Sequence, residues 1–145
     1  NILGDKIVHC GPVGMGSRMK IVNNYQSTSL NVLTAETLTL AQASGLDVNL
    51  AIEVMRETTA GRGHMNATYP DQVLSGNIEP GFMIDLAHKD LGLALETTAE
   101  LHTPAFLGAA ARQAYSIAQS KGQGKNDWTG IYITLQQLAG LDTST

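Results

Sequence analysis

Residues 11–44 read GPVGMGSRMKIVNNYQSTSLNVLTAETLTLAQAS, and this stretch decides the fold class. After Gly16 it contains neither glycine nor proline, the two residues that most often end a helix, until Gly45 follows it. We therefore predict one helix from about Met15 to Ser44. At roughly 1.5 Å per residue, such a helix is about 45 Å long. This length favours a helical domain that oligomerises, because a small monomeric domain covers only part of so long a helix.

One polar stripe runs along this helix and begins at a lysine. Its members lie three, four, seven and eleven residues after the first, a spacing that places them on one helical face. They are Lys20, Asn23, Asn24, Ser27 and Asn31. The other faces carry apolar residues, among them Ile21, Val22, Leu30, Val32 and Leu33. The pattern predicts that most of the helix surface is buried.

Two interpretations of Lys20 follow from this position. Desolvation lowers the pKa of a lysine, so a buried lysine can exchange a proton near neutral pH. The amides of Asn23 and Asn24 can then hold the amine or bind a substrate oxygen. In the alternative, Lys20 reaches solvent near the start of the helix and has no chemical role. The spacing by itself favours this alternative, because lysines beside amides are common on helices.

The rest of the chain also has the pattern of helices separated by glycine and proline turns. Further helices are predicted over Asp47–Thr58, with Asp47 as the N-cap, and over Met83–Leu101, Pro104–Lys121 and Asp127–Ala139, with a short interrupted piece over His64–Leu74. No segment alternates with a period of two for long, so no sheet is expected. The predicted fold class is all-α, a helical bundle around the one long helix.

Composition excludes several classes of protein. The 145 residues include nine basic and thirteen acidic side chains and no basic cluster, which argues against nucleic-acid binding. No apolar stretch approaches the roughly 20 residues of a membrane span. The single cysteine, Cys10, excludes an internal disulfide and fits a cytoplasmic protein. The four histidines lack the spacing of metal ligands, so we expect no metal.

Two motifs resemble those of the β-hydroxyacid dehydrogenases, the family that contains 3-hydroxyisobutyrate dehydrogenase. The first is the glycine turn of residues 11–16 followed by Lys20, Asn23 and Asn24, which resembles the catalytic-lysine motif of that family. The second, FMIDLAHKDL at residues 82–91, resembles the family segment that ends in a Lys-Asp pair. The resemblance extends from about Gly11 to Leu138. Residues 60–64 and 85–91 look most similar to the sulfolactaldehyde reductases of this family, which are also described as 4-hydroxybutyrate dehydrogenases.

The resemblance implies the helical C-terminal domain of a two-domain enzyme. In that family an N-terminal Rossmann domain carries a glycine fingerprint for the dinucleotide, and no such fingerprint stands in this sequence. Residues 1–10 would then be the tail of that domain, and residues 11–145 a helical domain for substrate binding and dimerisation. The implied cofactor is NAD, with NADP as the alternative, bound mainly by the other domain. This chain alone would be inactive, and the intact protein would be a dimer or tetramer.

The resemblance also implies roles for single residues. Lys20 would donate or accept the proton, with Asn24 beside it, and Asn23 and Ser27 would bind the substrate. Lys89 would reach the cofactor, Asp90 would orient the catalytic lysine or its neighbours, and Phe82 would pack beside the nicotinamide. Without the family, Lys89 is expected to pair with Asp85, one helical turn before it. Arg62 lies between two glycines, where it either binds an anion or, as we favour, faces water.

The implied substrate is a small anionic aldehyde or hydroxyacid. The similarity favours sulfolactaldehyde, then succinic semialdehyde, with tartronate or methylmalonate semialdehyde behind them. The alternative class is a catalytically silent helical module that dimerises or binds a partner. Such a module would be recognised by the loss of Lys20, and because Lys20 is present with Asn23 and Asn24, the sequence favours the enzyme.

Overall fold

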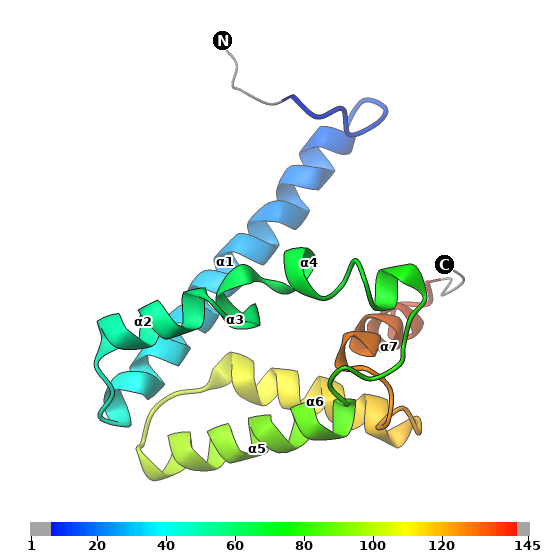
Figure 1. Ribbon diagram of the computed structural model, residues 1–145. Coiled ribbons are helices and arrows are strands. Elements are labelled where there is room, and N and C mark those ends of the chain that lie inside the picture. The colour runs from blue at the N-terminus through cyan, green and yellow to red at the C-terminus, as the bar shows by residue number, and fades with distance from the viewer. Residues whose placement is uncertain (1–6, 142–145) are drawn as a thin grey trace. The chain divides into compact units, whose positions relative to one another are not determined.

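A computed structural model describes residues 7–141, apart from the side chains of residues 21, 24, 25 and 27–29 (Figure 1). Part of the predicted tail, residues 1–6, therefore lies outside the described residues. The described part of the chain forms helices and short 3-10 turns without a strand, and its one isolated antiparallel bridge joins Met83 to Asp127. The chain divides into two compact units, residues 1–35 and 36–145, and each is described by itself below.

Helix α1, Met15–Ala43, matches the predicted long helix to within a residue at either end. It follows a turn in which Gly11 and Gly14 have φ angles of 113° and 94°, which side chains with a Cβ rarely adopt. Its C-terminus is closed by Gly45, whose φ is 79°, and by a hydrogen bond from the Leu46 amide to the Ala41 carbonyl. The boundary between the two units falls within this helix.

The described residues fit the predicted all-α class, but the predicted burial of most of this helix surface is wrong. Among the described side chains of α1, only Ala41 is buried, while Leu30 and Val32 are each 47% exposed. Lys20 and Asn23 are exposed as well, and for Lys20 this is the position that the spacing by itself favoured. The physical reason for the exposed helix surface is that the apolar residues of α1 are spread around the helix, so no single apolar stripe is available for bundle packing.

The second unit holds the remaining helices. They are α2 (Val48–Arg56), α3 (Thr59–Arg62), α4 (His64–Ala67), η1 (Val73–Ser75), α5 (Ile84–Glu100), α6 (Phe106–Ser120), η2 (Trp128–Gly130) and α7 (Ile131–Leu138). Asp47 caps α2 as predicted, because its carboxylate accepts a hydrogen bond from the Leu50 amide at 2.8 Å. The piece predicted over residues 64–74 is divided among shorter elements, since Thr68 already leaves the helical conformation.

Packing in the second unit centres on the pair α5 and α6, which run side by side (Figure 1). The buried apolar residues there are Val73, Ile84, Ala87 and Ala118. Gly92 is buried in α5, and a Cβ at this position would lie 3.2 Å from Nε of Arg112 on α6. The same Nε donates a hydrogen bond to the His88 carbonyl. The glycine thus leaves room for a guanidinium between the two helices.

The last part of α1 contributes a cap to α6. The Glu36 carboxylate accepts hydrogen bonds from the amides of Leu107, at 3.0 and 3.2 Å, and Gly108, at 3.4 Å. These amides lie in the first turn of α6, where backbone N–H groups have no partner within the helix. A carboxylate there also interacts favourably with the helix dipole.

No helix between residues 7 and 141 is both long enough and apolar enough to cross a membrane.

Replacing Ile84 by alanine is expected to destabilise the fold by about 2–5 kcal/mol, because its fully buried side chain would leave a cavity between α5 and its neighbours. Urea unfolding measures this difference. The matched control is Leu93→Ala on the exposed side of the same helix, which should cost below about 1 kcal/mol. Equal losses for the two variants would contradict the assigned core.

Candidate active site

The second motif begins just before α5, where a buried carboxylate fixes the backbone. Asp127 is 1% exposed, and its Oδ2 accepts hydrogen bonds from the amides of Gly81 (3.1 Å) and Phe82 (3.3 Å). Its Oδ1 accepts from the amide of Thr129 at 2.9 Å and from its hydroxyl at 2.6 Å. These four bonds satisfy a charge that would otherwise be costly to bury.

Further backbone hydrogen bonds join the segment before α5 and the start of α5 to residues 124–128. The amide of Trp128 donates to the Phe82 carbonyl at 2.7 Å, and the amide of Ile84 donates to the Asn126 carbonyl at 3.0 Å. The Asp85 amide donates to the carbonyl of Gly124 at 2.9 Å. The first amides of α5 thus find partners outside the helix. The segment that carries Phe82 is therefore held by the loop between α6 and α7.

Aromatic rings pack where the segment before α5 meets the loop that carries Trp128. Phe82 is half-buried, and its ring centroid lies 5.1 Å from that of Trp128 at an interplanar angle of 80°. The ring of His64 also lies 4.7 Å from that of Trp128, at 81°. Edge-to-face pairs at such distances are favourable beyond the area that they bury. Phe82 thus presents a ring whose backbone and one edge are both fixed.

A small cavity of about 40 Å³ lies behind these rings, lined by His64, Tyr69, Tyr115, Trp128, Thr129 and Ile131. Burial raises the pKa of Tyr115 to about 12 and also raises the pKa of Tyr69. Both phenols therefore stay neutral at physiological pH. Partial burial lowers the pKa of His64 below its ordinary value, which favours the neutral ring.

Lys89 and Asp90 form an ion pair, with Nζ and Oδ1 3.1 Å apart and the two side chains 61% and 54% exposed. The expected pairing of Lys89 with Asp85 is wrong. The Asp85 carboxylate instead accepts a hydrogen bond from Gln119 at 2.8 Å and pairs with Lys125 at 3.1 Å. Asp85 is directed toward α6 and the loop that follows it, so a lysine on its own helix is not its partner. Lys89 keeps an ammonium that solvent reaches.

Residues of the first motif belong to the first unit, and those of the second motif to the second unit. Lys20 and Asn23 are exposed on α1, whose unbroken helical backbone keeps the predicted spacing of the stripe. The side chains of Asn24 and Ser27 lie outside the described part of the structure.

Sequence reasoning missed the contributions of Asp127, Trp128 and His64. It treated Asp127 only as the start of a helix, and Asp127 does cap η2 through the Thr129 amide. Its bonds to residues 81 and 82 reach across 46 and 45 positions of the chain, and no local pattern indicates them. The one available signal was an aspartate directly before the only tryptophan of the chain.

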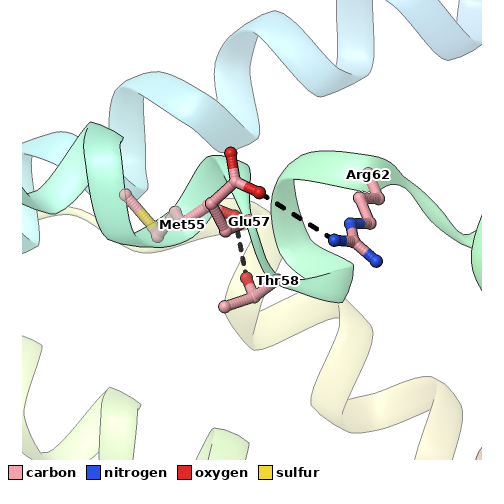
Figure 2. Close-up of polar contacts among 4 residues, drawn as sticks. All are labelled: Met55, Glu57, Thr58 and Arg62. Atoms are coloured by element: carbon pink, nitrogen blue, oxygen red, sulfur yellow. Dashed lines mark hydrogen bonds and ion pairs between the residues drawn. The ribbon is translucent and has the colours of Figure 1, made fainter.

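An open surface hollow of about 800 Å³ lies over the α2–α4 region, lined by Glu57, Thr58, Thr59, Arg62, Asn66 and Ala67. Figure 2 shows the Arg62 guanidinium directed toward Glu57, at 3.9 Å, and the Thr58 hydroxyl donating to the Met55 carbonyl at 2.8 Å. Such an exposed pair contributes little to stability. At the back, a Cβ on Gly61 would lie only 2.6 Å from the Met55 carbonyl oxygen. Arg62 faces water, the interpretation that the sequence favoured.

Among residues 7–141, no group of three His, Cys, Asp or Glu side chains could hold a metal ion.

Residues 14–135 match the protein family described as "NAD-binding of NADP-dependent 3-hydroxyisobutyrate dehydrogenase". The chain belongs to this family. The match covers the second motif and the first motif from Gly14 onward, and it confirms the resemblance on which the sequence interpretation rested. The expected cofactor class, NAD or NADP, is confirmed for the family.

Named relatives agree with this membership. The 3-sulfolactaldehyde reductase of Escherichia coli (strain K12) is 46% identical over 139 residues, which are 96% of this chain and 47% of that protein. The 2-(hydroxymethyl)glutarate dehydrogenase of Eubacterium barkeri is 32% identical over 144 residues, covering 99% of this chain and 48% of the relative. This chain therefore spans about half the length of the curated relatives that it matches.

The fold is similar to that of a solved imine reductase from Pseudomonas sp., with a TM-score of 0.66 at 15% sequence identity. That likeness covers 83% of this chain and 42% of the other. At this identity it supports the fold alone.

The family match corrects the expected fold class in a second respect. We predicted a C-terminal helical domain that leaves the cofactor mainly to a Rossmann domain, and this is wrong because the matched domain is itself described as NAD-binding. The sequence argument equated dinucleotide binding with a glycine fingerprint between a strand and a helix. Helices can also contribute groups to a dinucleotide site, and the fingerprint does not detect them.

Replacing Asp127 by asparagine is expected to destabilise the fold by about 2 kcal/mol or more, because an amide nitrogen cannot accept hydrogen bonds and two donors lose their acceptor. Thermal or urea unfolding measures the change. Asp71→Asn, at an exposed aspartate, is the control and should change stability by less than about 0.5 kcal/mol. A fully stable Asp127→Asn protein would show that the four bonds matter little.

A second expectation concerns the carboxyl group of Asp85. The hydrogen bond from Gln119, followed by that from Lys125, lowers the pKa of Asp85 below its ordinary 3.8. The folded state then binds fewer protons than the unfolded state. Asp85 therefore adds stability above its ordinary pKa, and this stability is lost as the pH falls through the lowered value.

Gln119→Leu removes the largest cause of the shift, so the pKa of Asp85 should rise toward 3.8, as measured by NMR titration of its carboxyl carbon. Gln113→Leu, on the exposed side of the same helix, should leave it unchanged. A pKa of Asp85 that does not respond to Gln119→Leu would contradict the assigned cause.

Proposed function

We propose that this chain forms part of an NAD(P)-dependent oxidoreductase that transfers hydride between a nicotinamide cofactor and a small anionic aldehyde or hydroxyacid. One observation carries the proposal: the stripe that begins with Lys20 lies on an unbroken helix of a chain that belongs to a dehydrogenase family. Relatives named as a reductase and a dehydrogenase support the same reaction class.

In this proposal Lys20 is the proton donor and acceptor. The bound nicotinamide supplies or takes up the hydride. During aldehyde reduction the Lys20 ammonium gives its proton to the developing alkoxide, and in the reverse direction the amine accepts it. The positive charge also stabilises the alkoxide as it forms. Asn24, four residues on, hydrogen-bonds the same oxygen, while Asn23 and Ser27 bind the anionic end of the substrate.

The cofactor would be held in part by the second motif. The chemistry of these residues fits a dinucleotide, since Lys89 offers an exposed ammonium for a phosphate and Phe82 offers a half-buried ring for a planar heterocycle. We propose that Lys89 contacts the cofactor and that Phe82 packs beside the nicotinamide. Asp90, through its ion pair with Lys89, would position that ammonium as well as the catalytic lysine or its neighbours.

Sulfolactaldehyde is the substrate that we favour, supported by the 46% identity to a relative named 3-sulfolactaldehyde reductase. Succinic semialdehyde follows, with tartronate and methylmalonate semialdehyde as alternatives. We further propose a cytoplasmic homo-oligomer, a dimer or tetramer. Its support is the single cysteine and the number of apolar side chains that α1 and α6 leave exposed, such as Val22 and Phe106.

The test measures consumption of NADH and of NADPH by the complete natural polypeptide that contains this sequence, with sulfolactaldehyde, succinic semialdehyde and tartronate semialdehyde. We expect turnover of at least one aldehyde, lowered by about three orders of magnitude or more in Lys20→Ala because the proton donor is lost. Arg18→Ala, which removes a neighbouring exposed cation of the same helix, is the control and should retain activity.

Turnover that survives Lys20→Ala would contradict the role of the lysine. If the folded protein turned over none of the aldehydes with either cofactor, the dehydrogenase proposal would fail. The silent helical module would then be the better description.

A further inference from the structure

We propose that His64 is a positioning residue for the cofactor pocket, acting through Trp128 on the ring of Phe82. This inference rests on the proposed function, in which Phe82 packs beside the nicotinamide. His64 lies far from both motifs in the sequence and contacts neither substrate nor cofactor in this proposal. Its effect passes through two ring contacts.

The first step is the pair of perpendicular ring contacts that Trp128 makes. The centroid of Trp128 lies 4.7 Å from that of His64 and 5.1 Å from that of Phe82, with interplanar angles of 81° and 80°. The three rings come from α4, from η2 and from the segment before α5. Three separate parts of the chain thus meet at one indole.

The backbones of Phe82 and Trp128 are held together, but their side chains are not. Phe82 and Trp128 are tied together by the 2.7 Å bond from the Trp128 amide to the Phe82 carbonyl. This bond fixes the two backbones but leaves the side-chain torsions free. The orientation of each ring is therefore set by what packs against it.

A cavity lies beside Trp128, so the contact with His64 matters for how the indole is packed. The cavity of about 40 Å³ is lined by both rings, so part of the indole surface has no packing partner. A side chain without a flat ring at position 64 would lose the perpendicular contact with Trp128 and let the indole turn. Phe82 would then lose the ring edge that holds it.

His64 is itself held in place by a hydrogen bond. Its Nδ1 lies 2.9 Å from the Thr68 hydroxyl, four residues along the chain, and its ring also lies 6.2 Å from that of Tyr69. The imidazole is therefore oriented before it meets the indole. Although His64 is exposed, this hydrogen bond restrains the rotation of its ring.

The experiment compares His64→Leu with His64→Phe in the complete natural polypeptide. Both variants are apolar and of similar size, but only phenylalanine keeps a flat ring edge toward Trp128. We expect His64→Leu to lower kcat about tenfold while the KM values for cofactor and aldehyde change less than about threefold, because a misplaced ring harms geometry more than binding. His64→Phe should restore kcat to within about threefold of the wild type.

Acrylamide quenching of tryptophan fluorescence reports on the indole directly, and the part of the signal that is lost in Trp128→Phe belongs to Trp128, the one tryptophan of residues 1–145. Quenching should increase in His64→Leu and stay near the wild-type level in His64→Phe. His9→Ala, at an exposed histidine of the first unit, controls for the loss of a histidine and should change neither readout.

Equal kcat values for the wild type and His64→Leu, or equal losses in both variants, would overturn this inference while leaving the proposed function intact. A wild-type protein without NAD(P)H-dependent turnover would overturn the proposed function and this inference with it. Unchanged quenching in a slow His64→Leu protein would show that His64 acts by another route, which also overturns it.

Discussion

The Asp127 carboxylate is the interaction on which the described second unit depends. It lies in the interior and is satisfied by three backbone amides and one hydroxyl. Because its two oxygens serve different segments, one side chain joins the approach to α5 with the start of η2. The helix that carries Lys89 and the turn that carries Trp128 therefore share one anchor. A hydrophobic contact could hold these segments together, but it would not fix their register as directional hydrogen bonds do.

Much of the helical pattern could be predicted, because its signals are local. The glycine-poor stretch after Gly16, the stop at Gly45 and the cap at Asp47 depend only on neighbouring residues, and the structure has all three. Burial could not be predicted in the same way. The sequence indicated a buried α1, yet most of its described apolar side chains are exposed, because burial is decided by what packs against a helix rather than by its composition.

The same difference between local signals and tertiary contacts separates the site residues that the sequence indicated from those that it missed. The residues of the two motifs could be proposed because a family resemblance is carried by short segments, and the family match extends from Gly14 over the second motif. Asp127 and the ring contacts of Trp128 were missed, since tertiary partners leave no periodic signal. The i−4 rule also failed for Lys89, because it considers one isolated helix and takes no account of Gln119 and Lys125 as competitors for Asp85.

Gly61 allows a close main-chain approach between α2 and α3 in the region of the surface hollow. Its missing side chain lets α3 approach the end of α2, because a Cβ there would lie 2.6 Å from the Met55 carbonyl oxygen. The Thr58 hydroxyl bonds the same carbonyl, and the exposed Glu57 carboxylate pairs with Arg62 of α3. The close main-chain approach at Gly61 does not depend on the charges of Glu57 and Arg62, so these charges can be exchanged while α3 keeps its approach to α2.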